Sequence, residues 1–286
     1  MIPGVAQAAV ETILAQEKAA MERWRHGNPM EWAAISADEV TYIEPDLTQH
    51  IRGLEAYRHY LSSLVGKVRY DESDVISPRV AVYGDVAVLA YNCVSTVREP
   101  GSEVVRRTPW NSTEVYASIE GRWRIIHTHR SYVRARPPDS LEVRSPARPA
   151  ATECEGVLAE LLSLERAAMD RWRRGDSWGF AELSADELTY FDPDTLRRID
   201  GLLALKAEFA RREDKMRCDM VEFVDPHVQA YGDAAVLSYR CLSTVSSLAG
   251  SHASRVPWNC TEVYVRRQGE WKIVHTHRSY VLGRRR

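Results

Sequence analysis

The sequence lacks most of the features that assign a protein quickly to a functional class. No apolar run approaches the roughly 20 residues of a membrane-spanning helix. The 38 basic and 40 acidic residues give a net charge of −2, without the cationic excess of a general nucleic-acid binder. No glycine-rich phosphate loop, nucleotide motif or G-x-S-x-G elbow is present. We therefore expect no nucleic-acid partner, no membrane association and no cofactor.

Cysteine is scarce, and its spacing fits neither a disulfide framework nor a zinc site. The five residues are odd in number and include no C-x-x-C pair. No secretory signal is recognised in the first residues, so the thiols are interpreted as reduced and the protein as cytoplasmic. For the same reason the glycosylation patterns at Asn111 and Asn259 are interpreted as strand residues.

The chain contains nearly the same sequence twice. A shift of 148 positions aligns Ala19–Val133 with Ala167–Val281 without a gap, and 54 of these 115 positions are identical. The longest shared runs are SADE, YGD, WN-x-TEVY and HTHRSYV. Two similar domains on one chain can pack as a built-in dimer, and each can diverge while the other keeps the fold.

Each half is expected to begin with helices and to end with strands. Apolar residues recur at helical spacing over Val10–Arg25 and Val157–Arg173, and a glycine follows each stretch. The later residues are rich in the β-branched and aromatic side chains typical of strands. In the first half we expect a short helix over 29–36, a strand over 40–44, a helix over 54–64 and strands over 79–83, 86–97, 107–119 and 122–133. Helices followed by an antiparallel sheet predict an α+β domain.

The segment between the two copies has the composition of a linker. Residues 134–152 contain four prolines, several arginines and no periodicity. We predict an N-terminal domain at 1–134, a linker at 135–152 and a C-terminal domain at 153–286. The two domains are expected to form an intramolecular pseudo-dimer, and further oligomerisation stays open.

Several stretches carry a resemblance to a known family. They are VTYIEPDL, IRGLEAYRHYL, SPRVAVYGDVAVLAYN, STEVY and GRWRIIHTHRS, each with a counterpart in the second half. They resemble the cone of nuclear-transport-factor-2-like proteins, shared with ketosteroid isomerase and the SnoaL-like cyclases. Locally they are most similar to the association (hub) domain of calcium/calmodulin-dependent kinase II. The resemblance implies two cones, each with helices packed on a curved antiparallel sheet, and it leaves function open because this fold hosts many activities.

Alternation along the last strand assigns its side chains to two faces of the sheet, because residues i and i+2 share a face. One face should carry Trp123, Ile125, His127, His129 and Ser131, and the other Arg124, Ile126, Thr128, Arg130 and Tyr132. The hub resemblance places the second face, with Arg130 and its counterpart Arg278, inside the pocket.

The same resemblance indicates that the cluster of arginines in the hub family's pocket is only partly present in this chain. Acidic and thiol side chains take the other positions. The resemblance places Glu114 and Glu262 where the hub family has another Arg, and Cys93 and Cys241 where it has a third. One Glu and one Arg in each pocket predict an ion pair, either a buried salt bridge that fixes the sheet or a polar centre that orients a ligand. Because a Glu near an Arg is normally held ionised, a base or an anchor is expected rather than a proton donor.

Further candidates surround the expected pocket mouth. Tyr42 and Glu44, with Tyr190 and Asp192 in the second half, share a strand face, and a phenol beside a carboxylate can polarise a carbonyl and move a proton. Ordinary strand and turn chemistry explains these pairs equally well. The expected walls of the two pockets are aromatic, as ligand contacts or as core packing: Trp32, Tyr57, Trp110, Phe180 and Trp258.

The H-T-H motif places two histidines on one strand face, opposite Arg130. Such a pair can bind zinc only with a third ligand, so a structural role in the pseudo-dimer contact is favoured and no metal site is predicted. In that contact Asn111, Thr113, His127 and His129 would lie near their counterparts in the other half.

Two functional classes remain. The first is a cofactor-independent small-molecule enzyme that uses general acid–base chemistry, as an isomerase, cyclase, dehydratase or hydrolase, in secondary metabolism for example. The second is a non-catalytic ligand-binding or assembly hub module. The two pockets differ, since Leu205 stands in place of Tyr57 and Phe180 in place of Trp32. We expect the N-terminal pocket to be the active one if the protein is an enzyme.

Overall fold

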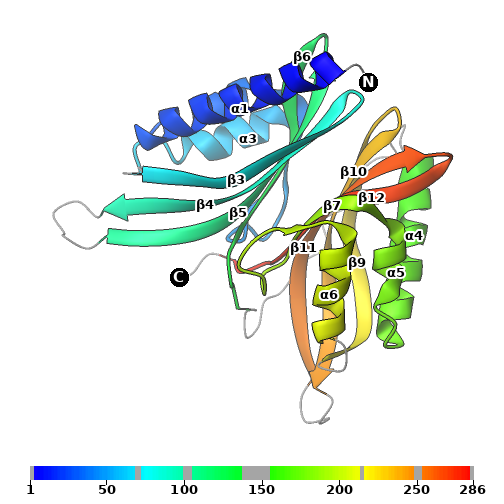
Figure 1. The fold of residues 1–286 in the computed structure, drawn as a ribbon. Helices are drawn as coiled ribbons and strands as arrows, with labels where there is room; N and C mark the ends of the chain where they lie inside the picture. Colours follow the sequence, from blue (N-terminus) through cyan, green and yellow to red (C-terminus); the bar gives the residue numbers. More distant parts are fainter. Residues whose placement is uncertain are drawn as a thin grey trace. The chain divides into compact units, whose positions relative to one another are not determined.

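In the residues that the structure describes, each half has three helices and a six-stranded sheet (Figure 1). The computed structural model describes residues 3–67, 72–98, 105–136, 155–212, 216–247 and 253–283. Contacts divide the chain into two compact units, Met1–Glu44 with Gln49–Val133 and Pro45–Thr48 with Arg134–Arg286. The predicted linker lies outside the described residues from 137 to its end at 152, so its form stays a prediction.

The N-terminal half follows the expected order of elements. They are α1 (Pro3–Arg25), α2 (Met30–Ala34), β1 (Ser36–Ile43), β2 (Ile51–Arg52), α3 (Leu54–Ser62), β3 (Glu72–Tyr83), β4 (Val86–Arg98), β5 (Val105–Ile119) and β6 (Arg122–Tyr132). The α+β prediction is therefore confirmed. The structure differs from the prediction in the short strand β2, in β1, which starts at Ser36 rather than at 40, and in α1 and β3, each of which starts seven residues earlier than predicted.

The C-terminal half repeats this order. Its elements are α4 (Glu155–Arg173), α5 (Trp178–Leu183), β7 (Ser184–Phe191), β8 (Ile199–Asp200), α6 (Leu202–Arg212), β9 (Met216–Tyr231), β10 (Ala234–Ser247), β11 (Ala253–Arg267) and β12 (Glu270–Tyr280). The strand orders are β2-β1-β6-β5-β4-β3 and β8-β7-β12-β11-β10-β9. Neighbours pair antiparallel, except that β1 runs parallel to β6 and β7 parallel to β12. The sheets are thus mixed rather than purely antiparallel.

The first helix of each half lies along one face of its own sheet (Figure 1). On α1 the buried side chains recur at helical spacing and include Ile13, Glu17, Ala20 and Trp24. A carboxylate within this apolar stripe is unusual, because burial of an ionisable group is costly unless a partner compensates it.

A β-bulge corrects the predicted faces of the last strand. Opposite β5 the pairing of β6 jumps from His127 with Val115 to Ile125 with Tyr116, so one extra residue inverts the alternation. In the second half, where the same jump occurs, Ile273 lines the cone together with Thr276 and Arg278. The prediction for Trp123 to Ile126 was therefore wrong, whereas that for 127 to 131 holds.

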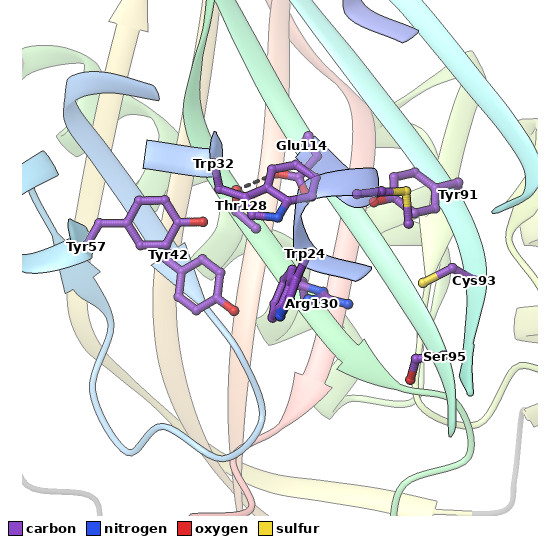
Figure 2. A pocket seen from close by; sticks show the side chains of 11 residues that line it. Trp24, Trp32, Tyr42, Tyr57, Tyr91, Cys93, Ser95, Glu114, Thr128 and Arg130 are labelled. Atoms are coloured by element: carbon purple, nitrogen blue, oxygen red, sulfur yellow. Dashed lines mark hydrogen bonds between the residues drawn. The ribbon is translucent and has the colours of Figure 1, made fainter. Parts of the chain in front are cut away.

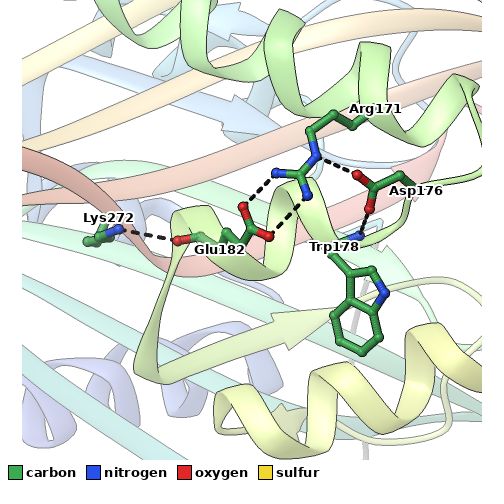
Figure 3. Close-up of polar contacts among 5 residues, drawn as sticks. All are labelled: Arg171, Asp176, Trp178, Glu182 and Lys272. Carbon is green, nitrogen blue, oxygen red and sulfur yellow. Dashed lines mark hydrogen bonds and ion pairs between the residues drawn. The ribbon is translucent and has the colours of Figure 1, made fainter.

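The C-terminal half has a polar clamp between its first two helices (Figure 3). Arg171 of α4 donates from Nε to Asp176 Oδ2 at 2.6 Å and from Nη1 and Nη2 to the two oxygens of Glu182 at 2.6 and 3.0 Å. Asp176 also accepts a hydrogen bond from the backbone N–H of Trp178, which begins α5. The aligned residues of the first half are Arg23, Asn28 and Ala34, which cannot form this clamp.

No helix in the described part of the chain combines the length and the apolarity needed to cross a membrane.

Candidate functional site

A cavity lies inside the N-terminal cone, between its helices and the sheet (Figure 2). Its walls are Met21, Trp24, Trp32, Tyr42, Tyr57, Tyr91, Cys93, Ser95, Glu114, Thr128 and Arg130. The enclosed volume is about 30 Å³, enough for water but far below the roughly 300 Å³ of an ordinary ligand pocket. The aromatic walls fill most of the interior, so a ligand has to displace side chains to enter.

Glu114 of β5 is buried against hydroxyl groups. It accepts hydrogen bonds from Thr128 and, at 3.2 Å, from Ser112. Burial raises its pKa well above the ordinary value and Glu17 raises it further, whereas Thr128 and Arg130 lower it. Burial and a second carboxyl thus oppose the effect of Arg130, which was expected to hold Glu114 ionised. The raised pKa favours the protonated form of Glu114, which is the form that can donate a proton.

Glu17 of α1 is the functional candidate that the sequence interpretation missed. Its carboxyl accepts hydrogen bonds from the hydroxyls of Tyr91 and Tyr116, the latter at 3.1 Å. Burial raises its pKa to about 7, against the opposing effects of these hydrogen bonds and of Arg130. Glu165 repeats the arrangement in the second half, where it accepts hydrogen bonds from Tyr239 and Tyr264. The available signal was a Glu at the same apolar helical position in both copies.

Arg130 lies between two indole rings. Its guanidinium carbon is 5.0 Å from the ring centre of Trp24 and 4.8 Å from that of Trp110, which holds the cation by cation–π attraction. Trp110 is fixed in turn by a 2.9 Å hydrogen bond from Nε1 to Ser95. The structure places Trp110 against Arg130, outside the set of residues that line the cavity. Trp258 stands in the same relation to Arg278, at 4.8 Å.

The predicted pair of Tyr42 and Glu44 is present in β1 and just after it. Tyr42 donates to Glu44 at 2.8 Å, and Tyr60 of α3 donates to the other carboxylate oxygen at 2.5 Å. Tyr42 lines the cavity and also stacks on Tyr57 at 4.9 Å between ring centres. Tyr42 therefore connects the cavity to a carboxylate behind it, and Tyr60 is a further partner that sequence reasoning did not include.

Two hydrogen-bond donors of the cavity wall have no partner. Trp32 is buried, and its Nε1 makes no hydrogen bond to any residue that the structure describes. The Tyr57 side chain is buried as well, and its hydroxyl forms no hydrogen bond with residues 3–67, 72–98 and 105–136 or with the described second half. Both groups lie on the cavity wall together with Arg130 (Figure 2). Burial of an unpaired donor such as Trp32 Nε1 costs about 1–3 kcal/mol, so a binding partner would stabilise it, and a ligand in the cavity can also accept from Tyr57.

The C-terminal cone has no counterpart of either donor, because Phe180 and Leu205 line it instead. Its cavity is about 20 Å³. Tyr190 donates to Asp192 at 2.9 Å, as Tyr42 does to Glu44. Burial, reinforced by Glu165, raises the pKa of Glu262 well above its ordinary value. The carboxyl and arginine groups are therefore shared by both cones, while the unpaired donors are specific to the first.

The histidines of the H-T-H motif face away from the cones. Thr41 contacts Nδ1 of His127 at 2.5 Å, and Thr189 contacts Nδ1 of His275 at 2.6 Å. Burial, followed by the charge of Arg198, lowers the pKa of His275 to about 3, so this ring is neutral. Within the described residues no three His, Cys, Asp or Glu side chains gather as a metal site would require. These contacts give the histidines a structural role in their own sheets.

A family comparison matches both halves of the chain. The model of the calcium/calmodulin dependent protein kinase II association domain matches residues 8–134 and 158–281. No match is found among curated proteins.

Similar solved structures each cover about half of the chain. A candidate ketosteroid isomerase from Parabacteroides distasonis is 34% identical, covering 42% of this chain and 85% of its own, with a TM-score of 0.37. The kinase II hub of S. rosetta is 24% identical, with 47% and 98% coverage and a TM-score of 0.37. A protein of the nuclear-transport-factor-2-like fold from Pseudomonas putida is 23% identical, with 43% and 86% coverage and a TM-score of 0.38.

Proposed function

Because the chain belongs, in both of its halves, to the calcium/calmodulin-dependent protein kinase II association domain family, we propose that its N-terminal cone has become a small-molecule site. In this proposal the site works by general acid–base chemistry without a cofactor, and the C-terminal cone serves as its structural partner. The single observation that carries the proposal is the pair of unpaired donors, Trp32 Nε1 and the Tyr57 hydroxyl, in the N-terminal cavity alone.

The arrangement favours a ligand with an acceptor oxygen. Trp32 and Tyr57 can each donate a hydrogen bond, and Arg130 adds a positive charge. Such groups stabilise a carbonyl oxygen on which negative charge develops. The cavity has a volume of about 30 Å³, so the substrate is a small carbonyl compound that enters when wall side chains move.

The same wall contains groups that can exchange protons with the ligand. Burial raises the pKa of Glu114, which favours the protonated carboxyl, so in this proposal Glu114 acts as the general acid. Tyr42 lies between the cavity and Glu44, and its hydroxyl can pass a proton from the ligand to that carboxylate. Together these roles amount to proton removal next to a carbonyl and its return elsewhere, the step shared by isomerisation and cyclisation.

The test is exchange of α protons in heavy water, followed by proton NMR over a panel of small ketones and aldehydes. We expect the wild-type chain to accelerate exchange for at least one compound, and Tyr57→Phe to reduce that acceleration by about 10²-fold. Tyr190→Phe in the second cone is the matched control and should leave the rate unchanged. Exchange at the uncatalysed rate across the panel would contradict the proposal.

A second candidate function is assembly. The family is named for association, and assembly does not require a cavity of ligand size. An assembly module would form a defined oligomer, seen by native mass spectrometry, would not accelerate exchange, and would respond equally to substitutions in either cone.

A further inference from the structure

A second cavity is lined by residues of α1 and of strands β3 and β4. Its volume is about 390 Å³, within the range of small-ligand sites. It is lined by Leu14, Glu17, Lys18, Met21, Glu22, Arg25, Val75, Pro78, Leu89 and Tyr91. Only Met21 and Tyr91 also line the cone cavity, so this groove is a separate site.

The groove combines apolar walls with one buried carboxyl. Leu14, Val75 and Leu89 supply apolar contact, while Glu17 is 4% exposed and each of its oxygens accepts one hydrogen bond. A carboxylate oxygen has two acceptor sites, so each oxygen can accept a further donor from the groove. Val75 is 40% exposed, which leaves this wall open to solvent.

The duplicated half shows what fits this space. Of the ten lining positions, seven are identical in the second half, and Lys18 and Glu22 become Arg166 and Asp170. The remaining change is Val75 to Phe223. The Phe223 ring packs on Tyr239, the counterpart of Tyr91, at 5.1 Å between ring centres. The second copy therefore fills with its own phenyl ring a position that the first copy leaves empty.

We propose that the groove of the N-terminal half binds a small aromatic amine. The aromatic ring takes the place that Phe223 occupies in the second half, against Tyr91, and the ammonium group donates hydrogen bonds to Glu17. The cation compensates the buried carboxylate, which otherwise carries the full cost of desolvation. This site does not depend on the activity proposed for the cone.

The rim charges are compatible with a cation. Glu22 pairs with Arg25 at 3.1 Å and contacts His26 at 3.2 Å, so two of the rim charges offset each other. Lys18 remains at the rim and opposes a cation, but its ammonium can extend into solvent. A negatively charged ligand would meet Lys18 at the rim and the carboxyl of Glu17 at the floor.

Three matched probes test the proposal: benzylamine, benzyl alcohol and benzoate, titrated into the full chain by isothermal calorimetry at pH 8. We expect benzylamine to bind with one site per chain and at least tenfold more tightly than the other two. Val75→Phe, which copies the residue of the second half, should weaken benzylamine binding at least tenfold while the far-ultraviolet circular dichroism stays that of the wild type. Phe223→Val should raise the stoichiometry from one site to two.

The Trp32→Phe variant of the cone serves as the control and should bind benzylamine like the wild type. Tighter binding of benzoate than of benzylamine would assign the site to Lys18 and overturn the proposal. Equal benzylamine affinity in wild type and Val75→Phe, or no saturable binding at all, would also overturn it. If benzylamine binds as expected but the cone does not accelerate α-proton exchange, the activity proposed for the cone is contradicted and the proposal for the groove is not.

Discussion

In the N-terminal cone, donors that lack hydrogen-bond partners are expected to favour ligand binding at the expense of the stability of the fold. Tyr57 and Trp32 are buried without hydrogen bonds to described residues, whereas Tyr42, in the same wall, donates to Glu44. These residues line the same cavity, but their polar groups contribute to the stability of the fold with opposite sign. An unpaired buried donor destabilises the fold, whereas a paired one stabilises it.

Tyr57→Phe is therefore expected to raise the free energy of unfolding by up to about 1 kcal/mol, since it removes an unpaired hydroxyl. Tyr42→Phe is the matched control and should lower it by about 1 kcal/mol, because Glu44 loses a hydrogen bond. Urea denaturation of the three proteins measures both values. A loss of stability of more than 1 kcal/mol in Tyr57→Phe would mean that its hydroxyl has a partner.

Glu17 makes stability depend on pH in an unusual direction. Its folded pKa of about 7 lies above the ordinary 4.5, so between these values the folded state holds more protons than the unfolded state. Stability is then lost as pH rises from about 4.5 to 7, by about 3 kcal/mol. Glu17→Gln has no proton to lose, so its unfolding free energy should fall less over this interval.

Denaturation at several pH values measures this difference. Glu11→Gln, an exposed carboxyl on the same helix, is the control and should follow the wild type. Parallel curves for the wild type and Glu17→Gln would contradict the assigned cause.

At the scale of elements, the two halves differ in how the second helix is attached to the first. In the second half Arg171 joins α4 to Glu182 of α5 by two parallel hydrogen bonds, and Gly179 allows close approach, since an added Cβ would lie 3.1 Å from Ala168. In the first half α2 carries Trp32 and lacks the clamp. The helix that covers the proposed working cavity is thus the less constrained of the two.

Asn28→Asp together with Ala34→Glu reconstructs the clamp on Arg23. Because the pair is partly exposed, we expect a gain of at most about 1 kcal/mol in stability. The clamp should restrain α2, which covers the cavity, and thereby slow ligand entry. The proposed α-proton exchange should then be slower. Glu182→Ala in the second half should reduce stability by a similar amount without affecting exchange. Unchanged exchange in the clamped variant would show that α2 does not move during entry.

The fold could be predicted from the sequence because the repeat, the helical spacing and the strand composition all indicate two α+β domains. Together with the resemblance to the hub family, the sequence placed Glu114, Arg130, Tyr42, Trp32 and Tyr57 around one pocket, and all five line the cavity. It did not give the faces of Trp123 and Ile125, since a bulge inverts alternation without a local sequence signal. It also missed the raised pKa of Glu114, which depends on burial and on Glu17, a residue 97 positions away.

At the scale of the whole molecule, fusion of two copies permits a division of labour. In a homodimer every substitution appears in both sites, whereas here Phe180 and Leu205 have changed one cone alone. The internal pseudo-dimer stays a prediction. It rests on the sheet face turned away from the helices, where Asn92 donates to Asn111 at 2.7 Å and Asn111 to Ser131 at 3.2 Å.

Small-angle X-ray scattering tests this packing. A single compact body of 286 residues has a radius of gyration of about 19 Å, and the pseudo-dimer should give a value close to it with one maximum in the distance distribution. A radius well above this value, with two maxima, would show that the halves are separate.

The most direct test of the central claim transfers the two donors from one cone to the other. In the first step Trp32→Phe and Tyr57→Leu give the N-terminal cone the side chains of the second, and α-proton exchange should fall to the uncatalysed rate. In the second step Phe180→Trp and Leu205→Tyr are added to that inactive protein. We expect exchange to return, now from the C-terminal cone, which already contains Glu262, Arg278 and Tyr190. Full activity after the first step would contradict the claim that the unpaired donors of the N-terminal cone form the working site.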